Sequence, residues 1–191
     1  MLKAVIAHLT DSSDTTYKLG SYLKDRTKVC VCSASELEAS PDFPDFTVIK
    51  CSDESLSGFF FSGIEYFSHD LGADDIVAFL PDTLLFSDRL VSYAMTLFER
   101  AEVGGISVSP KDCGLVEAGE RCDDYNLYSY YNEPPLAEDF KNAVFLRVPL
   151  VRLIQERRLQ NALKFHFVFR AMFEGCRASG MIWMNVVNER L

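Results

Sequence analysis

The stretch between residues 75 and 108 constrains the fold of this chain more than any other. An apolar run at 76–80 ends in Pro81-Asp82-Thr83, an amphipathic helical pattern follows at about 86–100, and a second apolar run begins at Val103 and ends at 108. Short apolar runs bounded by turn formers are typical of buried strands. Two such strands joined by a helix predict a βαβ unit in a parallel sheet.

The same alternation of strand and helix runs through most of the chain. Further strands are predicted at 3–9, 28–32, 46–49, 142–148 and 181–187, with helices after residue 13 and at 56–71, 149–159 and about 163–175. This order predicts an α/β fold: one domain over 1–191, built as a Rossmann-like three-layer sandwich with a mainly parallel central sheet and helices on both faces.

Residues 110–140 interrupt this rhythm. They are acidic and rich in tyrosine, and they contain two consecutive prolines. A long loop inside the domain is expected here, and such loops are usually functional or mobile. The tyrosines either form one wall of a binding cleft or pack the loop against the domain.

Composition argues against several classes of function, although the arginines and lysines of the last third leave a nucleic-acid partner open. The chain has 191 residues and a net charge of −9, which is a poor general match to nucleic-acid backbones. Its six cysteines lack a Cys-x-x-Cys pair, so a structural zinc site is not expected, and Cys30 and Cys32 are interpreted as small buried hydrophobic residues in a reducing compartment. The first apolar segment lacks a cleavage site and no run is long enough to cross a membrane, so a cytoplasmic protein is expected.

The motifs for several common chemistries are missing. The sequence has neither of the two glycine-rich phosphate loops, no Gly-x-Ser-x-Gly, and only three histidines without metal-ligand spacing. What remains is nucleotide binding without a glycine fingerprint. Asp82, at the end of a central strand with Thr83 and Ser87 nearby, is either a metal or phosphate anchor or a turn residue that caps the next helix.

Several segments together resemble the family 2 glycosyltransferases, which have the GT-A fold. The most specific is Phe79-Leu80-Pro81-Asp82-Thr83-Leu84-Leu85, which is similar to the family's strand ending in Asp-x-Asp or Asn-Pro-Asp-Thr. Val103-Gly104-Gly105-Ile106 resembles the strand after the next helix. The segments 57–64, 142–147 and 166–175 resemble, in order, the family's glycine-rich segment, its strand beneath the acceptor site and its Asp-x-x-x-Arg helix.

The resemblance implies a glycosyltransferase that moves a sugar from a nucleotide-diphosphate donor to an acceptor hydroxyl. It implies that Asp82 coordinates a divalent ion, Mn²⁺ or Mg²⁺, which neutralises the leaving diphosphate. Thr10, Asp11 and Asp53 follow predicted strands and are candidates for contacts to the base or ribose of the nucleotide sugar. The acceptor, whether saccharide, protein or modified nucleic acid, is not indicated, nor is the oligomeric state.

The general base is the less defined part of this site. His166 is the candidate by position, with Glu138 and Asp139 as loop alternatives, and His166 is equally consistent with a core histidine on an aromatic helix. Leu80 stands where the family has the first acid of its metal motif. That departure favours an alternative function, a degenerate, non-catalytic GT-A-like domain that binds a partner. A nucleotidyltransferase ranks third, because the turn after the first strand is acidic rather than rich in Gly, Arg or Lys.

Overall fold

The computed structural model describes residues 1–10, 12–23, 27–37, 46–83, 88–110, 127–130, 143–156 and 165–188. In these ranges eight strands form one sheet: β1 (Leu2–His8), β2 (Thr27–Ser33), β3 (Thr47–Lys50), β4 (Ile76–Pro81), β5 (Val103–Pro110), β6 (Leu127–Tyr130), β7 (Ala143–Arg147) and β8 (Ile182–Asn188). The helices are α1 (Ser13–Leu23), α2 (Leu56–Phe67), α3 (Asp88–Leu97), α4 (Val148–Glu156) and α5 (Phe165–Ala178), with a 3-10 turn, η1, at Ser68–Asp70.

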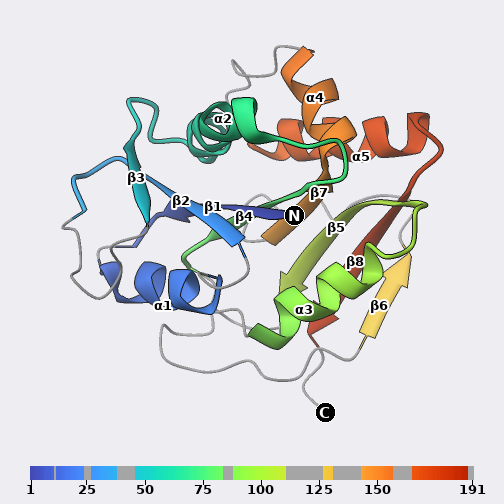
Figure 1. Ribbon diagram of the computed structural model, residues 1–191, viewed down its shortest axis with the longest axis horizontal. Helices are drawn as coiled ribbons and strands as arrows, with labels where there is room; N and C mark the ends of the chain where they lie inside the picture. Colours follow the sequence, from blue (N-terminus) through green and yellow to red (C-terminus); the bar gives the residue numbers. More distant parts are fainter. Residues whose placement is uncertain are drawn as a thin grey trace.

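The sheet order is β3-β2-β1-β4-β7-β5-β8-β6 (Figure 1). Strands β1 to β4 are parallel to their neighbours among themselves, and β5 is parallel to β8. Strand β7 is antiparallel to both β4 and β5, and β6 is antiparallel to β8. The mainly parallel central sheet predicted from the sequence is therefore confirmed, with β7 inserted against the common direction.

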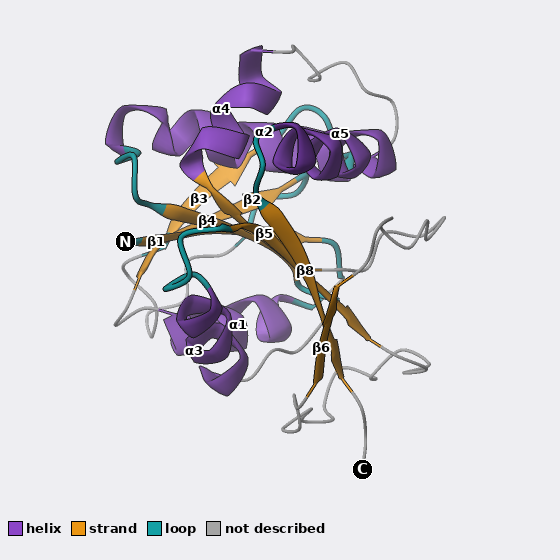
Figure 2. Ribbon diagram, turned by 90° about the vertical axis from the view of Figure 1, so that its right-hand side faces the viewer, coloured by secondary structure: helices purple, strands orange, loops and turns teal. Residues whose placement is uncertain are grey.

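Helices cover both faces of the sheet (Figure 2), as predicted. Helices α2, α4 and α5 pack on one face around Phe60, Ile154 and Phe173, whereas α1 and α3 pack on the other around Leu19 and Val91. Strands β1 and β4 lie between the two layers and are buried along their whole lengths. Strands with two covered faces read as continuous apolar runs, which is why these two were readily predicted.

The predicted loop at 110–140 needs a correction. Residues 127–130 form β6, which pairs with β8 through Leu127 opposite Val187 and Tyr130 opposite Met184. The alternating sequence Leu-Tyr-Ser-Tyr is too short to be separated from a tyrosine-rich loop by pattern alone, and only the partner strand defines it. The remaining residues of that segment lie outside the described ranges, and so do the two interpretations of its tyrosines.

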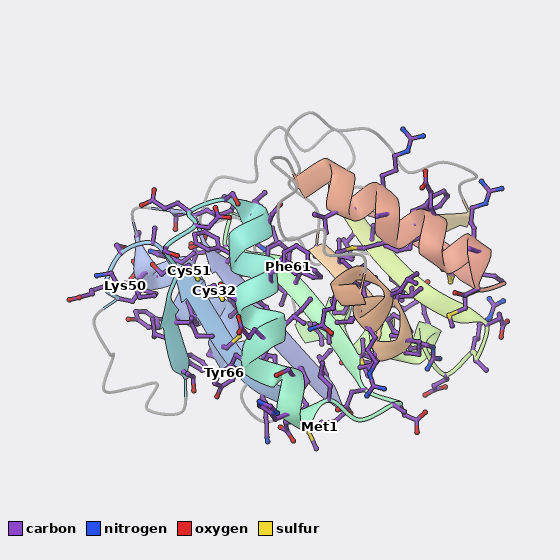
Figure 3. The ribbon with its side chains drawn as sticks, turned by 90° about the horizontal axis from the view of Figure 1, so that it is seen from above. Met1, Cys32, Lys50, Cys51, Phe61 and Tyr66 are labelled. Atoms are coloured by element: carbon purple, nitrogen blue, oxygen red, sulfur yellow. The ribbon has the colours of Figure 1, made fainter. Side chains whose placement is uncertain are left out.

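Helix α2 approaches the sheet closely because it carries glycines on its buried side. A Cβ atom on Gly63 would lie 2.4 Å from Cγ1 of Val5 in β1. Beside the same helix lie Cys32 and Cys51 (Figure 3), and Cys30, Cys32 and Cys51 belong to the core cluster that this helix helps to form. These three cysteines are free and buried, so the expectation that Cys30 and Cys32 act as small core residues is confirmed.

Charged side chains form ion pairs at the edge of the sheet where β1 begins. In Figure 3, Met1 lies near the end of α2 that also carries Tyr66. Lys3 is buried and its Nζ lies 2.8 Å from Oδ2 of Asp70, and Lys28 contacts the same oxygen. Hydrogen bonds from Lys28 and then Lys3 lower the pKa of Asp70 to about 2.

Arg147, the last residue of β7, closes the turn between α3 and β5. Its guanidinium donates hydrogen bonds to the carbonyl oxygens of Val103, Phe98 and Arg100 at 2.6, 2.5 and 3.1 Å. It also lies 5.4 Å from the centre of the Phe98 ring. Carbonyls at the end of a helix have no partner within the helix, so the arginine supplies one.

Candidate functional site

The carboxyl-terminal ends of β1 and β4 meet where the strand order changes direction. From β1 the chain continues to β2 and β3 on one side, and β4 is then added on the other side of β1. In open α/β sheets the crevice beyond such strand ends is the usual ligand-binding position. Three buried polar residues gather there: His8, Thr16 and Asp82.

The pairing register explains why His8 and Asp82 are neighbours. Strands β1 and β4 pair up to Ala7 opposite Pro81, and the amide of Asp82 donates to the carbonyl of Ala7 at 3.0 Å. Alternate residues of a strand point to the same face. His8 and Asp82 therefore continue the row of side chains, including Leu80, that faces α1 and α3.

The carboxylate of Asp82 is the centre of a hydrogen-bond network. Its Oδ1 accepts from the amide of Leu9 at 2.8 Å. Its Oδ2 accepts from the hydroxyls of Thr10 and Thr16, each at 2.8 Å, and lies 2.7 Å from Nδ1 of His8. The side chain of Asp82 is 0% exposed. This one carboxylate thus joins β4 to the end of β1, the following turn and α1.

Helix α1 brings Thr16 to this network through its buried face. Thr16, Leu19 and Leu23 are each no more than 1% exposed, and their spacing of three and four residues places them on one side of the helix. The two leucines pack in the core, and Thr16 lies one turn nearer the helix start, beside Asp82. Its hydroxyl is also 2.9 Å from Nδ1 of His8.

The predicted nucleotide contacts lie in two places. Thr10 belongs to the network, where its hydroxyl is 2.8 Å from both Oδ2 of Asp82 and the carbonyl of Ser12. Asp11 lies outside the described residues. Thr10 is thus held at the site by the carboxylate of Asp82, for which a metal role was predicted. Contact of Thr10 or Asp11 with a nucleotide stays a prediction.

Asp53 organises the start of α2. Its Oδ1 accepts from the amide of Ser55 at 2.9 Å, and hydrogen bonds from the side chain and backbone of Ser55 lower its pKa. Ser55 caps the helix by accepting from the amide of Gly58 at 3.0 Å. A Cβ on Gly58 would come within 2.5 Å of Asp53, so this glycine allows the turn to close. A nucleotide contact of Asp53 is a prediction that none of these bonds tests.

The predicted general bases are less well placed by the structure. His166 is in the first turn of α5, which packs on the face opposite to α1, and its side chain lies outside the described set. Glu138 and Asp139 are also outside the described residues. The catalytic role of His166 remains a prediction, and Asp82 itself faces away from the layer that contains α5.

As placed here, Asp82 does not fit a metal ligand. Its carboxylate is enclosed and receives four hydrogen bonds, and Leu80, at the position of the family's first acid, is a core residue that is 1% exposed. Within the described ranges no group of three His, Cys, Asp or Glu side chains could hold a metal ion. The metal role predicted for Asp82 stays a prediction, and the contacts support a positioning role.

Sequence reasoning missed His8 and Thr16. A weak signal existed for His8, because it is the last residue of an otherwise apolar strand and precedes a polar turn. No signal identified Thr16, since a threonine near a helix start is usually a capping residue. Close by, the hydroxyl of Thr83 is one of three side-chain oxygens in the described ranges that are buried without a hydrogen-bond partner, the others being those of Thr27 and Ser57.

Comparisons by sequence and by fold give different results. No protein-family model matches the sequence, and no curated protein matches it significantly. Solved structures do match. A 2-C-methyl-D-erythritol 4-phosphate cytidylyltransferase from Thermus thermophilus matches with a TM-score of 0.57 and 9% identity, over 99% of this chain and 88% of that chain.

Two further structures are similar. A nucleoside-diphosphate-sugar pyrophosphorylase from Vibrio cholerae has a TM-score of 0.52 and 8% identity, over 98% of this chain and 91% of its own. A CMP:2-keto-3-deoxy-manno-octonic acid synthetase complexed with CTP has a TM-score of 0.50 and 12% identity, over 97% and 89%. At such identities the likeness shows the fold alone. The predicted Rossmann-like α/β fold is confirmed, whereas the three matches do not support the family 2 glycosyltransferases specifically.

Proposed function

We propose that this chain is a nucleotide-binding transferase whose nucleotide lies over the carboxyl ends of β1 and β4. One observation carries the proposal: a buried polar network around Asp82 occupies the point where the strand order changes direction. The buried hydroxyl of Thr83, next to Asp82, has no partner among the described residues, and it supports the proposal because buried polar groups normally have partners. The fold likeness to enzymes named for cytidylyl transfer and for a CTP complex supports it further.

Nucleotidyl transfer is the reaction we favour. An acceptor oxygen would form a bond to the α-phosphorus of a nucleoside triphosphate, and the bond to the leaving pyrophosphate would break. The fold likeness favours this reaction over glycosyl transfer, which reverses the order expected from the sequence. The acidic turn after β1, which argued against it, is held by hydrogen bonds to Asp82 rather than by cationic residues.

Glycosyl transfer from a nucleotide sugar is the second candidate. The resemblance of the Pro81-Asp82-Thr83 segment supports it, and it would break the bond between the sugar and the nucleoside diphosphate. The two candidates share a nucleotide site and differ in the product they release, pyrophosphate in one case and a nucleoside diphosphate in the other.

A protein-held metal has no part in this proposal, because the enclosed Asp82 does not fit one. The Mn²⁺ or Mg²⁺ expected from the resemblance stays a prediction. Mg²⁺ belongs in the assays nevertheless, since it accompanies nucleotide phosphates in solution and binds mainly through them. The expected cytoplasmic location is likewise untested; in the described part of the chain, none of the helices has the length and apolar character needed to cross a membrane.

Calorimetric and thermal-shift titrations test the shared site. The full chain is titrated in Mg²⁺ with CTP, UTP, GTP and ATP, and separately with UDP-, GDP- and dTDP-sugars. Ligand at a hundred times its Kd stabilises the folded state by about 2.7 kcal/mol, which raises the midpoint of a chain of this size by about 5–10 °C. Failure of every nucleotide and nucleotide sugar to bind at millimolar concentration would reject the proposal.

Product release then separates the candidates. The best-bound nucleotide is incubated with a panel of sugar phosphates and sugars, and pyrophosphate and nucleoside diphosphate are measured. Pyrophosphate that appears only with an acceptor supports nucleotidyl transfer, and nucleoside diphosphate from a nucleotide sugar supports glycosyl transfer. Binding without either product would favour the non-catalytic binding module.

A further inference from the structure

We propose that His8 is the residue that recognises the nucleoside part of the ligand, with Nε2 of its ring as the hydrogen-bond acceptor and Asp82 as the residue that positions the ring. The inference rests on the proposed nucleotide-binding function and adds a specificity-determining residue that the sequence did not indicate. It assigns Nε2 a nucleobase amine or a sugar hydroxyl as partner, rather than a phosphate.

The hydrogen bonds of the network define the state of the ring. Nδ1 of His8 faces Oδ2 of Asp82 at 2.7 Å and Oγ1 of Thr16 at 2.9 Å. A carboxylate only accepts hydrogen bonds, and Thr16 uses its single proton toward the same Oδ2 at 2.8 Å. Both neighbours therefore present lone pairs to Nδ1, so Nδ1 carries the proton. In the neutral ring Nε2 then holds the free lone pair.

Nε2 is the open atom of this ring. No hydrogen bond to it occurs within the described residues, and it is not one of the three buried side-chain atoms there that lack a partner. The His8 side chain is 7% exposed, against 0% for Asp82. The ring is thus anchored at Nδ1, and its side chain is slightly exposed near the strand ends where a ligand would lie.

The local charges favour a neutral hydrogen-bond donor over a phosphate. Asp82 lies directly behind the ring, and Asp14 occupies the first turn of α1, where it already offsets the helix dipole. At the same edge, Lys50 at the end of β3 is paired with Glu36 at 3.1 Å. A lone pair at Nε2 accepts from an N–H or O–H group and repels a phosphate oxygen. Histidine fixed by a carboxylate has a defined direction, which suits it to specificity.

Two substitutions of His8 distinguish the role of Nδ1 from that of Nε2. In His8→Asn the side-chain amide can still donate to Asp82 from near the Nδ1 position, but the acceptor at Nε2 is gone. In His8→Gln the longer side chain can place its carbonyl oxygen near the former Nε2. His69, an exposed residue of η1 at the opposite edge of the sheet, supplies the matched control His69→Asn.

The binding measurement uses the nucleotide that binds the unmodified chain most tightly, chosen from CTP, UTP, GTP and ATP with Mg²⁺. We expect His8→Asn to weaken its binding by about tenfold, the equivalent of one hydrogen bond. His8→Gln should recover part of that loss, and His69→Asn should change nothing. Binding of inorganic triphosphate should be the same in all variants. Comparison with the 2′-deoxy nucleotide distinguishes a ribose hydroxyl from a base amine as the donor.

Imidazole ¹⁵N spectra provide a readout that needs no substitution at His8. The chain has only three histidines, His8, His69 and His166, so selective labelling gives few signals. The free protein should show a protonated Nδ1 on His8, and saturating nucleotide should move the Nε2 signal of His8 while that of His69 stays unchanged. This measurement decides the matter even if the variants fold poorly.

The outcomes distinguish this inference from the function on which it rests. If no nucleotide binds the unmodified chain, the proposed function fails and the inference fails with it. If a nucleotide binds but Nε2 does not respond and His8→Asn binds normally, the proposed function stands and the role of His8 is wrong. A loss of triphosphate binding in His8→Asn would also overturn the inference, because it would show that the His8 ring contacts the phosphates and not the nucleoside.

Discussion

Removal of the Asp82 carboxylate should destabilise the fold more than any other single truncation of a polar side chain at this edge of the sheet. In Asp82→Ala four donors lose their acceptor at once: the ring of His8, the amide of Leu9 and the hydroxyls of Thr10 and Thr16. The loss therefore affects β1, the turn after it and α1 together, although the substitution is in the turn that ends β4.

The magnitude follows from which donors can find another partner. Thr10 can redirect its hydroxyl to the carbonyl of Ser12, already 2.8 Å away. Oγ1 of Thr16 and Nδ1 of His8 are 2.9 Å apart and can bond to each other, which leaves one buried donor of this pair without an acceptor. The amide of Leu9 is the second donor left without an acceptor. Hydrogen bonds to a charged group contribute about 1.5–3 kcal/mol each, so two unreplaced bonds give about 3–6 kcal/mol.

Urea unfolding, followed by circular dichroism and by the fluorescence of the single tryptophan, measures this loss. With an m value of about 2–3 kcal/mol per molar urea, the midpoint should fall by about 1–3 M. Asp74→Ala is the control, because Asp74 is exposed and should cost less than about 0.5 kcal/mol. An Asp82→Ala midpoint no lower than that of Asp74→Ala would refute the network as a source of stability.

Three further predictions concern the rest of the fold. The pKa of Asp70 is lowered to about 2. The stability that its carboxylate contributes is therefore present above the ordinary carboxyl pKa and is lost as pH falls from about 4 toward 2. Over that range, the difference in urea midpoint between the parent chain and Asp70→Asn should become smaller. Gly63→Ala should cost about 1–2 kcal/mol in the same assay, since its Cβ would overlap Val5 at 2.4 Å, and an unchanged midpoint would show that α2 can shift freely. Arg147→Met should cost about 2–3 kcal/mol, because the carbonyls of Val103 and Phe98 lose the arginine donor and that of Arg100 keeps only the amide of Val103. Amide hydrogen exchange at the end of α3 should also become faster, and equal exchange in both proteins would contradict this.

The strands and helices were largely predictable because burial produces a local pattern of apolar residues in the sequence. β1 and β4 appear as continuous apolar runs, and the helices appear through the spacing of their buried residues. β6 was missed because four alternating residues are too few to form such a pattern. The direction of β7 was not predictable because its pairing with β4 and β5 depends on where the chain returns to the sheet.

At the site, the sequence identified Asp82 and Thr10 but not the other partners of the carboxylate. Asp82 stood out because it follows a buried strand and precedes a helix, and this position suggested either a metal or phosphate anchor or a helix cap. Its true environment depends on His8 and Thr16, which are 74 and 66 residues away along the chain. No local pattern connects residues at that separation.

The sequence by itself determined the fold class, since the period of its apolar residues records which faces of each element are buried. The tertiary structure decided which groups surround Asp82. The register between β1 and β4 places His8 beside Asp82, and the packing of α1 adds Thr16. The carboxylate is therefore enclosed by four donors. Burial is encoded residue by residue along the chain, whereas the partner of a polar group is fixed only when distant elements pack against each other.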